Sequence, residues 1–393
     1  MACVGSFAMC GKVVSLAMAL AVLVSPCMAE PHSISEAEFS KLLNRAENGS
    51  LSAQAQVAKA YSAGRAGNID YREAARWYHK AADQGDPDSQ TNLGVLYLLG
   101  HGVERNEAEA VRWFQRAAAS GYPLAVHNLG IAYSNGWGVA KDSEYGFELL
   151  LRSATAGLDV SQVAVGLAYI NGDIVSPNAE LAVKWLKRAS HQRLPSADFV
   201  LGIAYENGQA VKADMEKAAE YYRKAAERNF AAAQNNLGRL YLQGKGVPKD
   251  RREALRLFTA AAQQGNGQSY LNLALCNLTG CAMLIDPVAA YSWYLSAQTC
   301  GVPIPQSFEE RFTSIGHELT EEQLKHAQLS SQTWIAQHPN VDPHSPLEIN
   351  HVPVAAVAAN REPRTLQNDE VLKTLWQRTQ YTPPRSNNRD SAR

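Results

Sequence analysis

The sequence predicts an all-α solenoid of seven 36-residue helix-turn-helix repeats with capping helices at both ends. Three columns of residues predict it, because each recurs every 36 positions without insertion or deletion. The first column is glycine: Gly64, Gly100, Gly136, Gly172, Gly208, Gly244 and Gly280. A tyrosine stands three residues before each glycine except the last, where Asn277 replaces it. The third column follows each glycine by six residues and is always Asp or Asn: Asp70, Asn106, Asp142, Asn178, Asp214, Asp250 and Asp286. Tandem units of this length are typical of solenoids, in which each unit contacts only its neighbours.

The composition fits a folded chain and gives no sign of a polyanion-binding surface. Of the 393 residues, 46% are hydrophobic and 19% are charged, which excludes disorder of the whole chain. The 37 Lys and Arg residues nearly balance the 38 Asp and Glu residues. We therefore expect no nucleic-acid partner, because nucleic-acid binding relies on an excess of basic residues.

Each repeat is expected to contain two helices. In the second repeat, the first helix should run from about Pro87 to Leu99, since proline is tolerated in a first helical turn. Gly100 should end it in the left-handed conformation. The second helix should begin after Asn106, because Asp and Asn side chains accept hydrogen bonds from the free N–H groups of a first turn.

The residues of these columns resemble Sel1-like repeats, the 36-residue relatives of the tetratricopeptide repeat. The unit AAAQNNLGRLYLQGKGVPKDRREALRLFTAAAQQGN shows the resemblance most fully, and similar units cover residues 51–302. The resemblance implies a right-handed α/α superhelix whose first helices line the concave face. It also implies a scaffold for protein–protein interaction. The fourth repeat departs from the pattern, with Ile174 in place of a loop glycine, and the seventh has Ala274 and Asn277 in place of Gly and Tyr.

Both flanks of the array carry helix signals typical of caps. Residues 30–50 should form an N-terminal capping helix, since Ser35 and Glu38 have the spacing of a capping box. Residues 303–337 should form C-terminal capping helices, with Thr320 placed to begin the last one. Such caps cover the stacking faces that end repeats would otherwise expose.

Residues 1–29 are predicted to be a signal peptide. Lys12 precedes the apolar run VVSLAMALAVLVS, and the small residue Ala29 fits a cleavage site before Glu30. The run has about 13 residues, whereas a membrane span needs about 20, so an uncleaved anchor is the alternative. We expect export across the inner membrane, a periplasmic location, and no transmembrane segment in the mature chain.

The mature chain would keep three cysteines, Cys276, Cys281 and Cys300. A regular hairpin would hold Cys276 and Cys300 about 12 Å apart along the helices, too far for a bridge, which needs Cα atoms within about 7 Å. Only Cys276 and Cys281 could pair, and only if the turn at Gly280 bends sharply. Disulfides are therefore not expected to be the main framework.

Residues 338–393 are predicted to be a Pro-rich, largely disordered tail. One segment of it, NDEVLKTLWQR, has Val371, Leu372, Leu375 and Trp376 on one helical face. Two interpretations stay open: the segment folds onto a partner, or it packs back on the solenoid without a function of its own.

The sequence contains none of the common catalytic motifs. It has no HExxH, CxxC, GxSxG or P-loop pattern, and its histidines occupy different columns of the repeat, so they do not stack as ligands. We therefore predict no catalytic residue, no metal site and no cofactor, and we expect a protein that is not an enzyme.

Candidate partner-binding residues lie on the first helices, where the repeat does not dictate the residue. Positions four and seven residues apart share one helical face. The resemblance would place this face in the concave groove. The candidates are His127, Ile131, Val163, Leu167, Ile170, Phe199, Ile203, Glu206 and Arg239. The competing interpretation is that the apolar ones belong to the core between helices.

These observations together favour a secreted or periplasmic scaffold that binds a protein or peptide segment in its groove. One alternative is a cell-envelope hydrolase acting on the cell wall or on a β-lactam, as some relatives are held to do. Another is a regulator that acts through its C-terminal tail.

Overall fold

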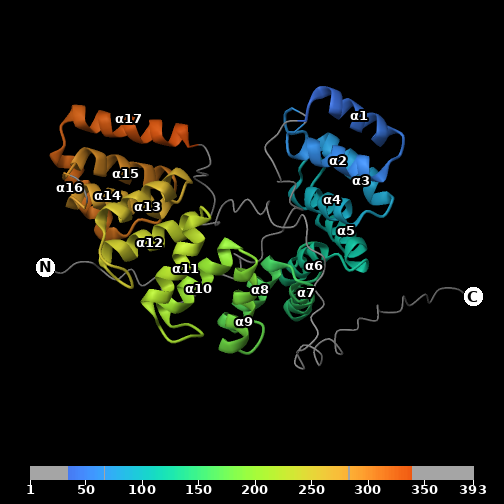
Figure 1. Ribbon diagram of the computed structural model, residues 1–393. Helices are drawn as coiled ribbons and strands as arrows, with labels where there is room; N and C mark the ends of the chain where they lie inside the picture. The colour runs from blue at the N-terminus through green and yellow to red at the C-terminus, as the bar shows by residue number, and fades with distance from the viewer. Residues whose placement is uncertain (1–33, 66, 282–283, 339–393) are drawn as a thin grey trace, which may run out of the picture. The chain divides into compact units, whose positions relative to one another are not determined.

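The computed structural model describes residues 34–338, except residues 66, 282 and 283 (Figure 1). This part of the chain contains 17 α-helices and no β-strand, which confirms the predicted all-α solenoid. Its helices belong to two units, one that ends at Leu158 and one that begins at Asp159. The predicted signal peptide and residues 339–393 of the predicted tail lie outside the described residues.

The unit that ends at Leu158 holds a capping helix and the helices of three repeats. These are α1 (Glu36–Glu47), α2 (Leu51–Ser62), α3 (Tyr71–Asp83), α4 (Pro87–Leu99), α5 (Glu107–Ala119), α6 (Pro123–Asn135) and α7 (Ser143–Thr155). The capping box at the start of α1 is present, because Ser35 accepts a hydrogen bond from the Glu38 backbone and the Glu38 side chain accepts from Ser35.

The unit that begins at Asp159 holds four repeats and two terminal helices. These are α8 (Asp159–Asn171), α9 (Ala179–His191), α10 (Pro195–Asn207), α11 (Met215–Glu227), α12 (Ala231–Gln243), α13 (Arg251–Gln263), α14 (Gly267–Thr279), α15 (Pro287–Thr299), α16 (Gln306–Glu318) and α17 (Glu321–Gln337). A second capping box, formed by Thr320 and Gln323, begins α17. No helix in the described parts of the chain is both long and apolar enough to cross a membrane.

The Asp and Asn column caps the second helix of every repeat, as predicted. Each side chain accepts a hydrogen bond from a backbone N–H two or three residues later, as Asn106 does from Glu109 at 3.0 Å and Asp214 from Lys217 at 3.0 Å. This contact satisfies a donor that the helix itself leaves free. The column therefore fixes where α3, α5, α7, α9, α11, α13 and α15 begin.

The glycine column ends the first helices in the left-handed conformation, as Gly100 does with φ 72°. The residue after the glycine then donates its N–H to a carbonyl five residues earlier, as His101 does to Leu96 at 3.1 Å. This pattern is the Schellman motif, which satisfies the last carbonyls of a helix.

A second loop glycine, present as Gly102, Gly138 and Gly246, lets the second, third and sixth repeats approach the repeat before them. A Cβ on Gly102 would lie 2.2 Å from the Tyr71 carbonyl oxygen, and one on Gly246 would lie 2.0 Å from the Met215 carbonyl oxygen. Only glycine fits at this distance, because its backbone can touch another backbone directly. In the fifth repeat the equivalent residue is Ala210, which adopts a left-handed φ of 60°.

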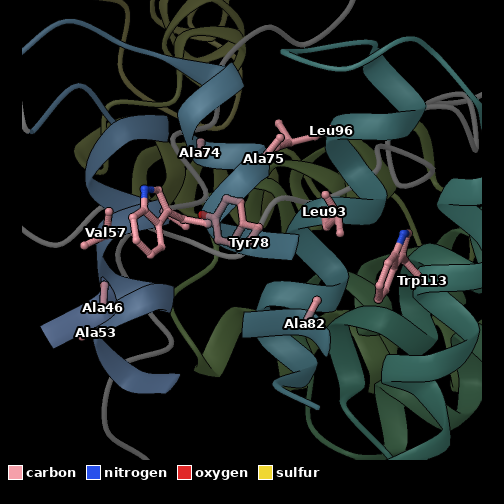
Figure 2. Packing of buried hydrophobic residues seen from close by; sticks show 12 residues of the cluster. Ala46, Ala53, Val57, Ala74, Ala75, Tyr78, Ala82, Leu93, Leu96 and Trp113 are labelled. Carbon is pink, nitrogen blue, oxygen red and sulfur yellow. The ribbon is translucent and has the colours of Figure 1, made fainter. Parts of the chain in front are cut away.

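The core lies between the paired helices, as the first unit illustrates (Figure 2). There Tyr78 of α3 and Leu93 of α4 are buried in one cluster with Trp113 of α5, and small alanines such as Ala74 and Ala82 fill the gaps between the helices. The alanines let the helix backbones approach closely around the larger aromatic side chains.

Candidate functional site

The nine predicted binding residues fall in both units and differ in exposure. His127 and Ile131 lie on α6, in the unit that ends at Leu158, and both are fully buried. The other seven lie in the unit that begins at Asp159. Among them Val163, Leu167 and Phe199 are buried. Ile170, Ile203, Glu206 and Arg239 are partly exposed. The latter four are the ones that a partner can reach in this arrangement.

Three first helices of the second unit present a continuous row of partly exposed side chains. We call it the α10–α12–α14 face. Its residues are Ile203, Glu206, Asn236, Arg239, Leu242, Asn272, Leu275 and Leu278. These eight residues come from three positions of the repeat, each taken from three helices. The ninth residue of the set, Val200 of α10, is buried. The face therefore combines aliphatic side chains with two amides and one pair of opposite charges.

An ion pair joins α10 to α12 in the middle of this face. The Arg239 guanidinium lies 2.5 Å from the Glu206 carboxylate, and the two side chains are 30% and 16% exposed. The Tyr222 hydroxyl of α11 donates a second hydrogen bond, 2.8 Å long, to the same carboxylate. Burial, followed by the neighbouring Glu206 carboxylate, raises the pKa of Tyr222 well above its usual value, so the phenol stays protonated as a donor.

Amide contacts join α12 to α14 beside the ion pair. Asn272 donates to the Asn235 side-chain oxygen at 2.7 Å, and the Ser269 hydroxyl donates to the same oxygen at 3.1 Å. Asn235 is buried, whereas Asn272 is partly exposed. These hydrogen bonds join the sixth and seventh repeats and hold the Asn272 side chain in place. Its exposed polar atoms therefore have fixed positions before any ligand arrives.

One of the predicted columns does not belong to this face. Phe199 packs in the core, with its ring 5.9 Å from that of Tyr222 and 5.1 Å from that of Phe230. The partly exposed column begins one residue later, at the position of Asn236 and Asn272, which the sequence reasoning missed. Asn also recurs at this position at Asn92 and Asn128, but both are buried, so the recurrence of Asn alone does not mark an exposed position.

The two charged groups of the face are paired with each other. Within residues 34–65, 67–281 and 284–338, no group of three or more His, Cys, Asp or Glu side chains is placed to hold a metal ion. Glu206 is neutralised by Arg239 and held by Tyr222, so the carboxylate accepts hydrogen bonds from fixed partners.

The repeats match a known family along most of the described chain. The model of the Sel1 repeat matches residues 51–86, 87–122, 123–158, 160–193, 195–230, 231–266 and 267–301. These segments make up more than half of the 393 residues and follow the helix pairs described above.

Several solved structures are similar to this chain, and two of them share 29% of its residues over the aligned part. The Sel1 repeat protein from Oxalobacter formigenes is 29% identical over 71% of this chain and 80% of its own, with a TM-score of 0.56. The protein c5321, a protective antigen present in uropathogenic Escherichia coli strains that displays an SLR fold, is 29% identical over 77% of this chain and 72% of its own, with a TM-score of 0.43. No curated protein sequence matches the chain.

Sel1 repeat proteins generally act as scaffolds for protein interaction and are typically not catalytic. The family match agrees with the capped helix pairs, the left-handed glycines and the close loop contacts that recur along the array. The chain belongs to the Sel1 repeat family.

Proposed function

We propose that this chain is a scaffold that holds an extended segment of a partner protein on the α10–α12–α14 face. The observation that carries the proposal is the Glu206–Arg239 pair, a partly exposed ion pair fixed by Tyr222 and flanked by aliphatic side chains. In a pair held in this way the positive and the negative group have fixed positions. The pair can therefore select a partner by the arrangement of its charges as well as by its shape.

The face offers the two kinds of contact that a peptide needs. Ile203, Leu275 and Leu278 supply apolar area to a partner's side chains. Asn236 and Asn272 each carry an amide, which can donate to a peptide carbonyl and accept from a peptide N–H. Since the helices are already ordered, the scaffold loses little conformational entropy when it binds.

We also propose that the scaffold works after export, in the periplasm. Support comes from the sequence of residues 1–29, which has the order of charge, apolar run and small residue found in signal peptides. Cell fractionation with N-terminal sequencing of the recovered protein tests this. A protein that starts near Glu30 in the periplasmic fraction supports it, and a full-length protein in the cytoplasm contradicts it.

Photo-crosslinking tests the binding face directly. A photoreactive residue placed at Leu275 should crosslink to a partner in the cells that carry the chain. The same residue placed at the exposed Arg256 of α13 is the matched control, because Arg256 lies outside the face. Equal products at both positions would contradict the proposed site.

Charge variants then ask what the ion pair contributes. Arg239→Glu should abolish the Leu275 product, because it places two carboxylates together. Glu206→Arg combined with Arg239→Glu restores an ion pair of reversed polarity. If the partner recognises the charge direction, the double variant stays inactive while its circular dichroism and melting temperature match those of the parent. Full recovery of binding would show that the pair only supports the fold.

A further inference from the structure

The end of α14, in the seventh repeat, brings two cysteines together. Cys276, Cys281 and Cys300 all belong to one core cluster, in which the first two are buried and Cys300 is half-buried. Gly280, between α14 and Cys281, is left-handed with φ 63° and ψ 45°. The chain therefore reverses sharply between Cys276 and Cys281.

The backbone of this turn holds the two cysteines against each other. The Cys281 N–H donates to the Cys276 carbonyl oxygen at 3.0 Å. In a helix end of this kind, the side chains of these two positions also meet. Here both side chains lie in the same buried cluster.

Other repeats show that the turn, rather than the cysteines, creates this arrangement. The same N–H to carbonyl bond joins Trp137 to Ala132 at 3.0 Å and Lys245 to Leu240 at 3.1 Å. Only in the seventh repeat do both positions carry a thiol. The approach of the two cysteines is thus set by the turn that the repeat forms, and this hydrogen-bonded turn brings their backbones within reach of a disulfide.

We propose that Cys276 and Cys281 form an intrachain disulfide when the folded protein meets a small disulfide oxidant, and that Cys300 stays free. The pair is then a thiol–disulfide site at the end of α14, which locks the turn at Gly280 in its bent form.

The two sulfur atoms have different roles in this reaction. Cys281 accepts a hydrogen bond from Cys276 and lies near Arg251 and Lys249, and these contacts lower the pKa of the Cys281 thiol. The hydrogen bond to Cys281 and burial raise the pKa of Cys276. Cys281 is also the more accessible of the two, at 4% against 0% exposure. Cys281 is therefore the attacking thiolate.

The exchange balances in two steps. The Cys281 thiolate attacks one sulfur of the oxidant, whose S–S bond breaks and releases one thiolate. Cys276 then gives up its proton and attacks the Cys281 sulfur, which forms the intrachain bond and releases the second thiolate. The protein pair loses two electrons, and the oxidant leaves as two thiols.

Cys300 lies too far from this turn to compete. It ends α15 and lies beside Tyr270, six residues before Cys276 on α14. Six residues of helix span about 9 Å, beyond the 7 Å or so that a disulfide allows between Cα atoms. Burial also raises the pKa of Cys300 to about 11, so it is a poor nucleophile near neutral pH.

Mass spectrometry of the full-length protein tests the proposal. The reduced protein is incubated with glutathione disulfide, quenched in acid, and alkylated after denaturation. Trypsin is unsuitable, since no Lys or Arg lies between Arg256 and Arg311, whereas chymotrypsin can cleave at Leu278, between the two thiols. A Cys276–Cys281 linkage with an alkylated Cys300 is the expected result. Alkylation of all three of Cys276, Cys281 and Cys300, or a linkage that includes Cys300, would overturn the proposal.

Single variants test the order of attack. Cys276→Ser should trap glutathione on Cys281, because the second thiol is missing. Cys281→Ser should leave Cys276 unmodified over the same time, and Cys300→Ser should oxidise as the parent does. Circular dichroism shows that each variant is folded. Glutathione trapped on Cys276 in the Cys281→Ser variant, at the rate seen for Cys281, would contradict the assigned roles.

Discussion

The fifth and sixth repeats, residues 195–230 and 231–266, place different chemistry at the same point of the array. In the sixth, Gln264 donates to the Gln234 side-chain oxygen at 2.7 Å, which ties α13 to α12. In the fifth, the same two positions hold Asp198 and Arg228, which form an ion pair between α10 and the end of α11. These two repeats therefore make the same link between neighbouring helices with different chemistry.

The two links differ in what their loss would leave behind. Asp198 is fully buried and also accepts a hydrogen bond from Ser190 at 2.6 Å, so its charge depends on partners inside the protein. Gln234 is neutral, and losing its partner leaves only one unsatisfied polar atom. An ion pair thus makes the fifth repeat more sensitive to a single substitution than the sixth.

Arg228→Ala should have the largest effect of the substitutions considered for these repeats. It leaves the buried Asp198 carboxylate without a cation, and we expect a loss of about 3 kcal/mol in the free energy of unfolding at neutral pH. Urea denaturation measures it. Gln264→Ala is the matched control in the sixth repeat and should cost about 1 kcal/mol. Equal losses in the two variants would contradict the distinction between the links.

The pH dependence of Arg228→Ala follows from Asp198. Burial raises the pKa of Asp198 above 3.8, despite the opposing contacts with Ser190 and Arg228. The folded state therefore holds this proton more tightly than the unfolded state. The contribution of Asp198 to the free energy of unfolding is fully present below pH 3.8. It is lost as the pH rises through the raised pKa of Asp198 in the folded state. Removing Arg228 raises the pKa of Asp198 further. The loss in the free energy of unfolding caused by Arg228→Ala should therefore become smaller on acidification, whereas the loss caused by Gln264→Ala should not change.

Gly202→Leu should be the next most severe change. A Cβ on Gly202 would lie 2.5 Å from a ring carbon of Tyr222, and that ring is anchored by its hydroxyl to Glu206. A Cβ on Gly238 would lie 2.8 Å from Phe258, which carries no hydroxyl to anchor it. We expect a loss of about 2 kcal/mol or more for Gly202→Leu. Gly238→Leu should cost less in the same denaturation experiment, and the reverse order would refute this account.

Replacing the ion pair by an amide pair should have a small effect. Asp198→Gln combined with Arg228→Gln removes both charges at once, so no buried charge is left, and we expect stability within about 1 kcal/mol of the parent. Thermal and urea unfolding of the double variant, compared with each single variant, give the coupling between the two positions. Additive losses would mean that the residues do not act as a pair.

Ala210→Gly should have the smallest effect, and it should be stabilising. Ala210 holds a left-handed φ of 60°, where the sixth repeat has Gly246 with φ 67°. Glycine adopts this conformation without steric cost, although it also gains freedom in the unfolded state. The net gain should be about 0.5 kcal/mol, visible as a higher melting temperature. A lower melting temperature would show that Ala210 makes contacts that offset its strain.

The fold could be predicted from the sequence because an array poses the same structural requirement seven times. The Asp and Asn column and the glycine column each serve one local need, a free N–H at a helix start and a left-handed residue at a helix end. Both requirements concern residues that are close together in the sequence. They can therefore be recognised without knowing how the helices pack. The ion pair was also readable in principle, since Asp198 and Arg228 stand 36 residues before Gln234 and Gln264.

The binding face was harder to predict, because exposure depends on the neighbouring helices. Phe199 and Val200 are adjacent apolar residues, and nothing local tells which of their columns a neighbouring helix covers. The structure places Phe199 among the rings of Tyr222 and Phe230, and leaves the column of Asn236 and Asn272 partly exposed. Charge was a better guide than hydrophobicity, since Glu206 and Arg239 are on the exposed side.

The loop glycines have a consequence for exchanging repeats between proteins. Gly102, Gly138 and Gly246 touch the backbone at the start of the second helix of the preceding repeat, where no side chain fits. Each such contact joins the loop glycine of one repeat to the second helix of the repeat before it. A 36-residue unit cut at its sequence boundaries would thus carry only one side of each of these contacts. The portable segment is instead one that runs from a second helix through the loop of the following repeat. Chimaeras joined between a loop glycine and the start of the second helix that follows it should keep their junctions intact, and those joined within the first helices should lose them.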